Sequence, residues 1–420
     1  MKILLFVGAL KEKLSANSNI VYQLSNAFSQ MGHTVWIVGK NENADIVKKI
    51  NNRFTYYSFY HENIADKALK HLQQFVEEAH IPREKAIQRF LIHYPVSALK
   101  IKLFYLLGDD INKAFCKKKV AALYQQEKFD KIIAVQIPFW TVQLLAELKC
   151  PQKDKFVYQL DPYGLHEFIE GKSKQERIAL EVKALRKANK IFTTPVLARQ
   201  YSAKKEYQSL TKDMVPIEFP SVLQKQITEQ NPLSFDANYI NVCYCGLIQE
   251  LYRNPDSLLK TMSILFDKKE KIRLYFVGDI QSENLMQYKK RYPDNIFTHE
   301  KVEIDVAFSI MHDADCLLNI SNQVSNQVPS KIFDYFSTGK PILNVQLIED
   351  CPALPYLQKY PLSYTLKNNT ENDMETLLAF LKGAKNQTIP FERVAQIFEE
   401  NTLEFVAEKM LSVMEHSESQ

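Results

Sequence analysis

Glycine is scarce in this sequence, at 10 of 420 residues. The scarcity leaves little room for the glycine-rich loops that wrap phosphate groups. Cysteine is scarce too, and six cysteines in so long a chain do not form a disulfide framework. No hydrophobic run reaches the length of a membrane span, and the apolar stretch of MKILLFVGALKEK is too short for a signal peptide. We therefore expect a cytoplasmic protein.

Patterns of metal ligands are missing as well. Cys243 and Cys245 alternate within an apolar strand pattern, which favours buried structural thiols over metal ligands. The histidines without ligand spacing include His93, His299 and His312. We expect no metal site.

The composition is that of a globular protein without a strong net charge. Hydrophobic residues make up 46% of the chain and charged residues 24%, which argues against disorder. The net charge of +4 arises from 53 basic and 49 acidic residues, a balance too even for a whole-surface nucleic-acid binder. At 420 residues the chain exceeds what one ordinary core supports, so two domains are expected.

The first half of the chain alternates between strand and helix patterns. KILLFVGAL (2–10) is a continuous apolar run of the kind found in buried parallel strands. A helical pattern follows and ends at Gly32, and HTVWIVGK (33–40) is the next strand. Further strand candidates lie at 131–138, 155–162, 190–195 and 214–220. Such βαβ units predict a parallel sheet with helices on both faces.

A polar stretch, 223–238, has the composition of an interdomain linker, and the alternation restarts after it. The patterns of the second half predict strand 240–248, helix 254–269, strand 271–279, strand 314–321, helix 329–339 and strand 340–345. The last forty residues look helical. We therefore predict an α/β protein with domains at 1–222 and 239–400 and a C-terminal helix, 401–420, that packs back on the first domain.

The loops after the strands of the second half are expected to form a binding site. They carry 246–253, Gly278 and the segment leading to Lys331, and open parallel sheets bind ligands beyond the carboxyl ends of their strands. Lys331 lies in the first turn of a helix between Pro329 and Gly339, where the macrodipole disfavours a cation by roughly 0.3–1 kcal/mol. A phosphate docked on the free N–H groups of this helix start would reverse that penalty.

Two more residues fit a nucleoside diphosphate. Arg253, from a neighbouring loop, is a second cation for the phosphates, and Asp334 is a carboxylate of the kind that accepts from ribose hydroxyls. The alternative is that Lys331 and Asp334, three residues apart, form a surface salt bridge worth a few tenths of a kcal/mol.

These segments together resemble bacterial glycosyltransferases of the GT-B fold, near the retaining nucleotide-sugar branch often called family 4. SNQVPSKIFDYFSTGKPIL (325–343) resembles their donor-binding segment, CYCGLIQELYRNPDSLLKTM (243–262) the opening of their donor domain, and LYFVGD and HDADCLLNIS two further markers. MGHTVWIVG (31–39) resembles the first βαβ unit of their acceptor domain. The resemblance implies two Rossmann-like domains facing across a cleft, the first holding the acceptor and the second the donor.

The resemblance also implies a set of nucleotide-binding residues. They are Gly246, Arg253, Gly278, Asn326, Ser330, Lys331 and Asp334. The implied donor is a nucleoside-diphosphate sugar, bound as a substrate, with no tightly held cofactor. Arg253 and Lys331 would stabilise the departing diphosphate in catalysis.

The sequence departs from the family pattern at two places. Asn326 stands where the family has a glutamate near the donor sugar, and the Gly-Gly of the first acceptor-domain loop is missing from GALKEKLSANSN (8–19). Asn17 and Ser18 could replace contacts at that helix start, but helix capping is favoured for them.

The stereochemical course stays open at this stage. A retaining enzyme of this type needs no carboxylate nucleophile, whereas an inverting one needs a general base from the first domain. Asp161, at the end of the strand KFVYQLDP, is the best-placed candidate, with His166 second. The competing interpretation of Asp161 is a turn or helix-cap aspartate before a proline.

One segment combines basic and apolar residues. VSALKIKLFYLL and NKAFCKKKVAALY, within 96–124, have the pattern of a helix that lies on an anionic membrane surface, at the inner face of the membrane for a cytoplasmic enzyme. An ordinary domain helix with a solvated basic face explains the pattern as well. Many enzymes of the resembled group act on lipid-linked acceptors, which favours the first interpretation.

The function expected from the resemblance is transfer of a sugar to a glycan or lipid-linked acceptor in bacterial surface polysaccharide synthesis. The alternatives are a sugar-nucleotide epimerase, whose two carboxylates and histidine are not found together here, and a non-catalytic GT-B subunit, for which Asn326 leaves room. The glycine spacing argues against an NAD-dependent dehydrogenase, because Gly8 does not begin a G-x-G-x-x-G motif.

Overall fold

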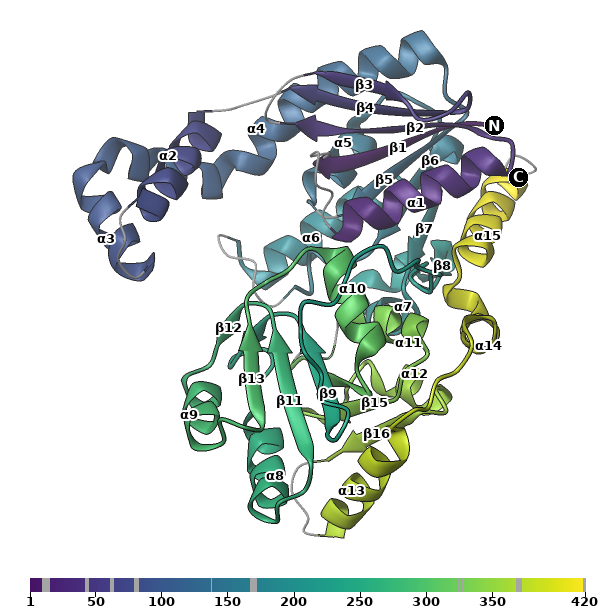
Figure 1. Ribbon diagram of the computed structural model, residues 1–420. Coiled ribbons are helices and arrows are strands. Elements are labelled where there is room, and N and C mark those ends of the chain that lie inside the picture. The colour runs from purple at the N-terminus through teal and green to yellow at the C-terminus, as the bar shows by residue number, and fades with distance from the viewer. Residues whose placement is uncertain are drawn as a thin grey trace. The chain divides into compact units, whose positions relative to one another are not determined.

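The computed structural model describes residues 1–9, 16–41, 45–60, 64–78, 83–136, 138–166, 172–323, 325, 328–367 and 372–417. The chain forms two compact units (Figure 1). The first unit is Met1–Glu218 with Leu403–Gln420, and the second unit is Phe219–Thr402.

The first unit contains a sheet of the order β3-β4-β2-β1-β5-β6-β7-β8. Its strands are β1 (Lys2–Ala9), β2 (Thr34–Asn41), β3 (Ile46–Lys49), β4 (Phe54–Tyr60), β5 (Lys131–Gln136), β6 (Lys155–Gln159), β7 (Lys190–Thr193) and β8 (Met214–Pro216). All neighbours are parallel except β3 and β4. The chain moves outwards from β1 to β2 and β4, then returns to the other side of β1 for β5 to β8. This reversal is the Rossmann-like arrangement.

Helices connect these strands. They are α1 (Ala16–Gln30), α2 (Ile64–Glu78), α3 (Arg83–His93), α4 (Pro95–Glu127), α5 (Trp140–Glu147), α6 (Lys174–Leu185), α7 (Pro195–Ser202) and, from the end of the chain, α15 (Leu403–His416). The continuous apolar run of β1 is buried on both faces, as the sequence predicts, with Leu4 and Leu5 fully covered. Helix α15 packs on α1, so the last helix belongs to the first unit.

Helices α2, α3 and α4 form an insertion between β4 and β5. They pack on one another, and α2 and α3 enclose a small core of their own, in which Ala68 and Phe90 are buried against Leu72 and Phe75. The basic and apolar segment 96–124 lies within α4, a single helix of 33 residues.

The second unit contains an all-parallel sheet of the order β13-β11-β9-β14-β15-β16. Its strands are β9 (Ile240–Cys245), β11 (Ile272–Val277), β13 (Ile296–His299), β14 (Cys316–Ile320), β15 (Ile342–Val345) and β16 (Ser363–Leu366), with a separate pair, β10 (Ile248–Gln249) and β12 (Ile280–Gln281). Its helices are α8 (Asp256–Asp267), α9 (Glu283–Arg291), α10 (Ile304–Asp313), α11 (Lys331–Thr338), α12 (Leu354–Lys359), α13 (Asn372–Ala384) and α14 (Phe391–Ile397). The direction reverses between β9 and β14, so this unit is Rossmann-like as well. The predicted α/β class with two Rossmann-like domains is confirmed.

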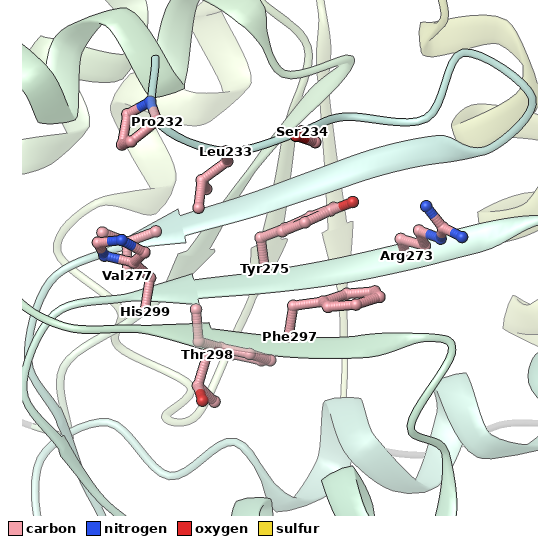
Figure 2. Close-up of a pocket in the computed structure, with 10 residues that line it drawn as sticks. Pro232, Leu233, Ser234, Arg273, Tyr275, Val277, Phe297, Thr298 and His299 are labelled. Carbon is pink, nitrogen blue, oxygen red and sulfur yellow. The ribbon is translucent and has the colours of Figure 1, made fainter.

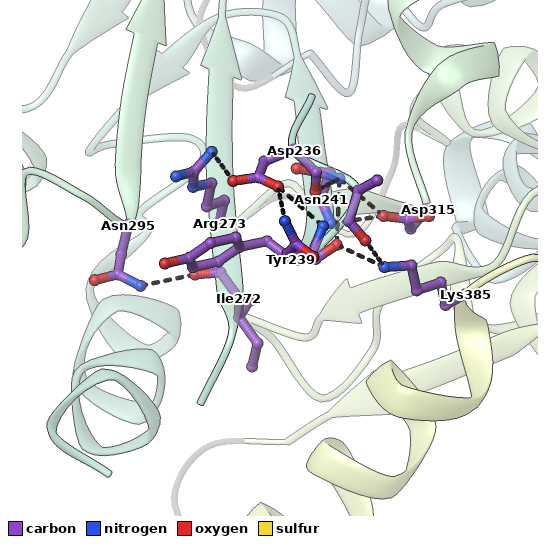
Figure 3. Close-up of polar contacts among 10 residues, drawn as sticks. Asp236, Tyr239, Asn241, Ile272, Arg273, Asn295, Asp315 and Lys385 are labelled. Carbon is purple, nitrogen blue, oxygen red and sulfur yellow. Dashed lines mark hydrogen bonds and ion pairs between the residues drawn. The ribbon is translucent and has the colours of Figure 1, made fainter. Parts of the chain in front are cut away.

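Polar contacts fix the start of the second sheet (Figure 3). The amide and side chain of Asn241, in β9, both donate to the Asp315 carboxylate, at 2.8 and 3.0 Å. Arg273 pairs with Asp236 at 3.3 Å, and its guanidinium stacks 4.0 Å from the Tyr239 ring. The segment that leads into β9 is therefore held to the sheet itself, at the end opposite the strand-end loops.

Candidate functional site

The strand-end loops of the second unit meet where the strand order reverses. Residues after β9 and β11 are tied together by the short parallel pair β10–β12, in the register Ile248 to Ile280. The loop after β14 joins them, because the Gln323 amide donates to the Tyr252 carbonyl at 3.0 Å. The carboxyl ends of β9, β11 and β14 thus form one edge, which is where open parallel sheets bind ligands.

Two of the predicted glycines allow the loops to approach. Gly278 has a φ of +137°, and a Cβ there would overlap the Gly246 carbonyl oxygen. Gly246 has a φ of +153°, and a Cβ on it would lie 2.9 Å from the Lys331 Nζ and 3.2 Å from the Tyr244 hydroxyl. Positive φ and the lack of space both require glycine here. Backbone and a lysine ammonium are consequently in close contact at the end of β9.

Lys331 reaches this point from the first turn of α11. Its ammonium donates to the carbonyl oxygen of Cys245, the last residue of β9. Burial lowers the pKa of Lys331, and the nearby Arg253 guanidinium lowers it further, while Cys245 and Asp334 act in the opposite direction. A partly buried cation that lies close to a second cation is a favourable place for an anion.

Arg253 comes from the loop that follows β10. Its Nε donates to the Asn322 side-chain oxygen at 2.8 Å, and its NH1 lies 3.5 Å from the Tyr244 hydroxyl. Burial raises the pKa of Tyr244, and Arg253 partly offsets that rise. Tyr244 and Asn322 were not predicted from the sequence, although both stand at strand ends beside predicted residues. They orient Arg253 towards the same edge as Lys331.

Helix α11 ends as predicted but starts differently. Gly339 caps it in the left-handed region with a φ of +71°. At the start, the N–H groups of Ile332 and Phe333 donate to the carbonyls of Pro329 and Ser330, at 3.1 Å each. The sequence predicts free N–H groups at this helix start, but these two already donate within the chain. The side-chain cations, together with the dipole, are therefore the main anion-attracting groups.

Asp334 pairs with a residue far away in the sequence. Its Oδ1 lies 2.7 Å from the Nζ of Lys225, in the segment before β9. The alternative prediction, a surface salt bridge between Lys331 and Asp334, is therefore wrong: Lys331 donates to Cys245 and Asp334 pairs with Lys225. The Asp334 side chain remains 30% exposed.

The structure brings together Gly246, Gly278, Arg253 and Lys331, with Asp334 one helical turn further along α11. Ser330 precedes the helix and is exposed; its side chain makes no capping bond. Asn326 lies outside the described residues. Asp161 belongs to the first unit, in the loop after β6.

That loop is ordered by a buried glutamate that sequence reasoning missed. Glu181, in α6, is fully buried and accepts from the backbone amides of Tyr163 and Gly164, at 2.9 Å each. Arg177, one turn earlier, donates to the His166 carbonyl at 2.6 Å. The sequence feature that could have revealed Glu181 is its place in α6, where the spacing of the apolar residues puts position 181 on the buried face.

A pocket of about 280 Å³ lies elsewhere in the second unit. It is lined by one face of β11 and β13, including Tyr275 and Phe297, with Leu233 of the preceding segment above them (Figure 2). The two rings stack with centroids 5.0 Å apart. None of the predicted site residues lines this pocket, so it is separate from the cations at the strand ends.

Sequence comparison alone finds no relatives: no protein-family model matches the chain, and neither does any curated protein. Solved structures match it along its whole length. WaaB, a lipopolysaccharide outer core galactosyltransferase in its apo form, has a TM-score of 0.58 at 10% identity, with 99% of both chains covered. Sucrose-phosphate synthase from Thermosynechococcus elongatus has a TM-score of 0.61 at 12% identity, with 100% of both chains covered. The catalytic domain of starch synthase IV from Arabidopsis thaliana, bound to ADP and acarbose, has a TM-score of 0.60 at 10% identity, covering 100% of this chain and 99% of that one.

These neighbours are GT-B glycosyltransferases. The chain has the GT-B fold. The predicted fold is therefore confirmed at an identity too low for sequence comparison to find it. Within the GT-B fold, the second unit carries the candidate anion site and the first unit carries the Asp161 loop.

Three further observations concern the described residues. Within the described part of the chain, no group of three or more histidine, cysteine, aspartate or glutamate side chains could hold a metal ion. Cys243 and Cys245 are buried free thiols in β9, with their sulfurs 3.8 Å apart in a hydrogen bond and no disulfide between them. The described helices include none that is both long and apolar enough to cross a bilayer.

Proposed function

We propose that this protein is a glycosyltransferase that uses a nucleoside-diphosphate sugar as donor. The observation that carries the proposal is the convergence of Lys331, Arg253 and Gly246 at the strand-order reversal of the second unit, in a chain with the GT-B fold. A diphosphate fits this edge because its negative charge would neutralise the two cations. Asp334, with Lys225 beside it, is the acceptor for the ribose hydroxyls.

The chemistry follows from the charges. When the bond between the sugar C1 and the diphosphate breaks, negative charge develops on the departing phosphate oxygens. Fixed cations stabilise that charge without reorganising, and removing one such group from an active site typically costs a factor of about 10²–10³ in rate. Lys331 and Arg253 hold these positions before the donor arrives, through the Cys245 carbonyl and Asn322. We propose a retaining course for the transfer.

Thermal unfolding in the presence of UDP, GDP, CMP, dTDP or NAD tests the donor site. A ligand at a hundred times its dissociation constant stabilises the folded protein by about 2.7 kcal/mol, so one nucleoside diphosphate should raise the melting temperature clearly. Asp334→Ala should lose that rise. Asp267→Ala is the matched control, because Asp267 also pairs with a cation, Arg291 at 3.8 Å, at the other end of α8 from the site. This control should keep the rise.

The absence of any nucleotide effect in the wild type would overturn the proposal. The second candidate is a non-catalytic GT-B subunit, which Asn326 makes reasonable because it stands in place of the family's glutamate. Slow hydrolysis of a nucleotide sugar separates the two. An enzyme releases nucleoside diphosphate in a reaction that Lys331→Met reduces, whereas a subunit that only binds nucleotide releases none.

We further propose that the acceptor is a glycan or a lipid-linked glycan, held by the first unit, in the synthesis of a bacterial surface polysaccharide. The neighbours support this, since WaaB is described as a lipopolysaccharide outer core galactosyltransferase and WaaG as a glycosyltransferase involved in lipopolysaccharide biosynthesis. A lipid-linked acceptor requires that the enzyme reach an anionic membrane surface, at the inner face of the membrane.

The junction of α3 and α4 supports such a contact. Its side chains include four apolar ones that face solvent: Leu91 (45% exposed), Ile92 (75%), Val96 (64%) and Leu99 (58%). Exposed apolar groups that lie this close together in the chain favour an interaction site. The exposed cations described in α2 to the start of α4 are Lys67, Lys70, Lys85, Arg89 and Lys100, and Glu78 is the one exposed carboxylate described there. Apolar groups among cations fit an anionic bilayer surface.

Co-sedimentation with vesicles tests this contact. The wild type should bind vesicles of phosphatidylglycerol and phosphatidylcholine and bind pure phosphatidylcholine weakly. Ile92→Glu should abolish binding, because a carboxylate replaces the most exposed apolar group of the junction. Val47→Glu is the control, since Val47 is 62% exposed on β3 of the same unit. Equal binding by wild type and Ile92→Glu would rule the junction out as the membrane contact.

A further inference from the structure

The loop after β6 has two partly exposed ends and a buried middle. Asp161 and His166, its chemically active residues, are partly exposed, whereas the segment between them, 162–165, is buried. Tyr163 in that segment stacks on Phe139, with ring centroids 4.1 Å apart. The position of Asp161 and His166 therefore depends on what holds the buried middle of the loop.

Glu181 holds the middle. Its Oε1 accepts from the Tyr163 amide at 2.9 Å and from the Gln136 side chain at 2.6 Å. Its Oε2 accepts from the Gly164 amide at 2.9 Å and from the Tyr207 hydroxyl at 2.5 Å. The carboxylate thus binds two consecutive loop amides with separate oxygens, which fixes the position and the orientation of both peptide groups.

The arrangement leaves no room for another residue at position 164. A Cβ on Gly164 would lie 2.7 Å from the Glu181 Oε2 and would overlap the Tyr207 hydroxyl. Gln136, which also contacts Glu181, donates to the Asp161 carbonyl at 3.3 Å. The contacts of Glu181 therefore extend to Asp161 itself.

Arg177 holds the far end of the same loop. It lies four residues before Glu181 on α6, so the two side chains leave the helix on one face. Its guanidinium donates to the His166 carbonyl at 2.6 Å and to the Lys172 carbonyl at 2.8 Å. One helix face therefore fixes the loop at both its middle and its end.

The free-energy cost of burying the Glu181 carboxylate indicates a role beyond packing. A fully buried carboxylate is expensive unless it is hydrogen-bonded or paired, and no ion pair of Glu181 occurs among the described residues. Neutral donors satisfy the Glu181 carboxylate instead. Burial raises the pKa of both Tyr201 and Tyr207, and the charge of Glu181 raises it further. Core packing alone would be served by an apolar residue at position 181.

We propose that Glu181 is a positioning residue for sugar transfer, which sets the geometry of Asp161 and His166 towards the acceptor through the Tyr163–Gly164 peptide. This inference rests on the proposed function. Glu181 does not touch substrate. It acts on the acceptor side of the reaction, so donor binding by the second unit is independent of it.

The test compares Glu181→Gln with Tyr207→Phe and Asp161→Asn, using hydrolysis of UDP-glucose and GDP-mannose as the probe reactions. Glutamine keeps the shape but offers one acceptor oxygen in place of two. We expect kcat to fall about 10–100-fold, as a displaced group near the reaction does, while the donor KM stays unchanged. Tyr207→Phe removes one donor and leaves both loop amides bound, so its effect should be smaller.

Combining the variants separates positioning from simple loss of stability. If Glu181 acts through Asp161, the double variant Glu181→Gln with Asp161→Asn should lose no more kcat than Asp161→Asn alone. Losses that multiply would overturn the proposal. If Glu181→Gln fails to fold, the same comparison is made with Tyr207→Phe.

Hydrogen exchange keeps the inference separate from the proposed function. The Tyr163 and Gly164 amides should exchange slowly in the wild type and at least tenfold faster in Glu181→Gln, whether or not a sugar is transferred. Exchange that does not change in a folded Glu181→Gln variant would overturn the positioning role. Slow exchange in a wild type that neither binds nucleotide nor hydrolyses the probes would overturn the proposed function alone.

Discussion

At the scale of single residues, Lys331 combines a structural bond with a charge that a ligand can use. Its hydrogen bond to the Cys245 carbonyl keeps the ammonium at the end of β9, whereas burial and Arg253 make the charged form less stable than in water. The residue is thus held in place at some electrostatic cost. A bound diphosphate removes that cost. With the diphosphate in place, the cation at this helix start is favoured, whereas the helix dipole alone disfavours it.

This coupling predicts a pH dependence of nucleotide binding. An anion favours the charged ammonium, so binding raises the pKa of Lys331 from its lowered value in the free protein. Affinity for the nucleoside diphosphate should therefore be full below that lowered pKa and fall as pH rises from it towards 10.5, the ordinary lysine value. Titration calorimetry across this range measures the effect.

Two variants and the stability of the free protein check the assignment. Lys331→Met should bind weakly with little pH dependence, and Lys331→Arg, which stays charged, should show a flat profile. The folding stability of the ligand-free protein should change with pH in the opposite direction from the affinity. Folding lowers the pKa of Lys331, so the unfolded chain binds more protons between that lowered pKa and 10.5. Stability therefore rises as pH rises through this range. A fall in affinity that persists in Lys331→Arg would assign the titration to another group.

At the scale of elements, the ends of α11 decide how its residues face the strand ends. Gly339 caps the helix with a φ of +71°, and a Cβ there would overlap the Ile389 carbonyl. The Ile389 amide in turn donates to the Gly339 carbonyl at 2.9 Å. This exchange of contacts ties the end of α11 to the segment before α14.

Gly339→Ala should therefore destabilise the second unit by at least about 1–2 kcal/mol, the usual cost of left-handed backbone for an alanine. Gly383→Ala is the control: Gly383 lies within α13 with nothing within 4 Å of its Cβ position, and alanine should stabilise a helix there by about 0.5–1 kcal/mol. Native-state hydrogen exchange of the β15 amides measures both. Equal effects of the two changes would contradict the role given to the cap.

How far the sequence predicts these elements depends on their place in the sheet. Central strands such as β9 and β14 are continuous apolar runs and were predicted locally. The edge strands β13 and β16 are short and half-exposed, so their patterns resemble loops. The candidate site of the second unit could be proposed from the sequence because strand ends and helix starts are local signals. The Lys225–Asp334 pair joins residues 109 positions apart, and no local pattern contains it.

At the scale of the whole molecule, both units reverse strand order beside their first strand. The chain places cations at this reversal in the second unit. In the first unit, the loop after β6, one strand beyond the reversal between β1 and β5, is held by the buried Glu181. The same architecture thus supports two chemically different sets of loops, one with the cations Lys331 and Arg253 and one with Asp161 and His166 beside a buried carboxylate. This difference supports the proposal that the second unit binds the donor and the first unit the acceptor.

The chain also returns to the first unit after completing the second. Helix α15 packs on α1, and Val406, Met410 and Met414 are fully buried there. Met410→Ala should therefore destabilise the first unit by about 2–5 kcal/mol, the range for truncating a buried methionine, although residue 410 follows the whole second unit in sequence.

Fluorescence can follow this effect in one unit only, because both tryptophans, Trp36 and Trp140, lie in the first unit. Met410→Ala should lower the urea midpoint of the tryptophan transition. Met286→Ala, at a methionine that is 40% exposed in the second unit, should leave that midpoint in place. The nucleotide-induced stabilisation of the second unit should persist in Met410→Ala at a temperature where the variant is folded. An unchanged tryptophan midpoint would mean that α15 adds nothing to the core of the first unit, against its burial.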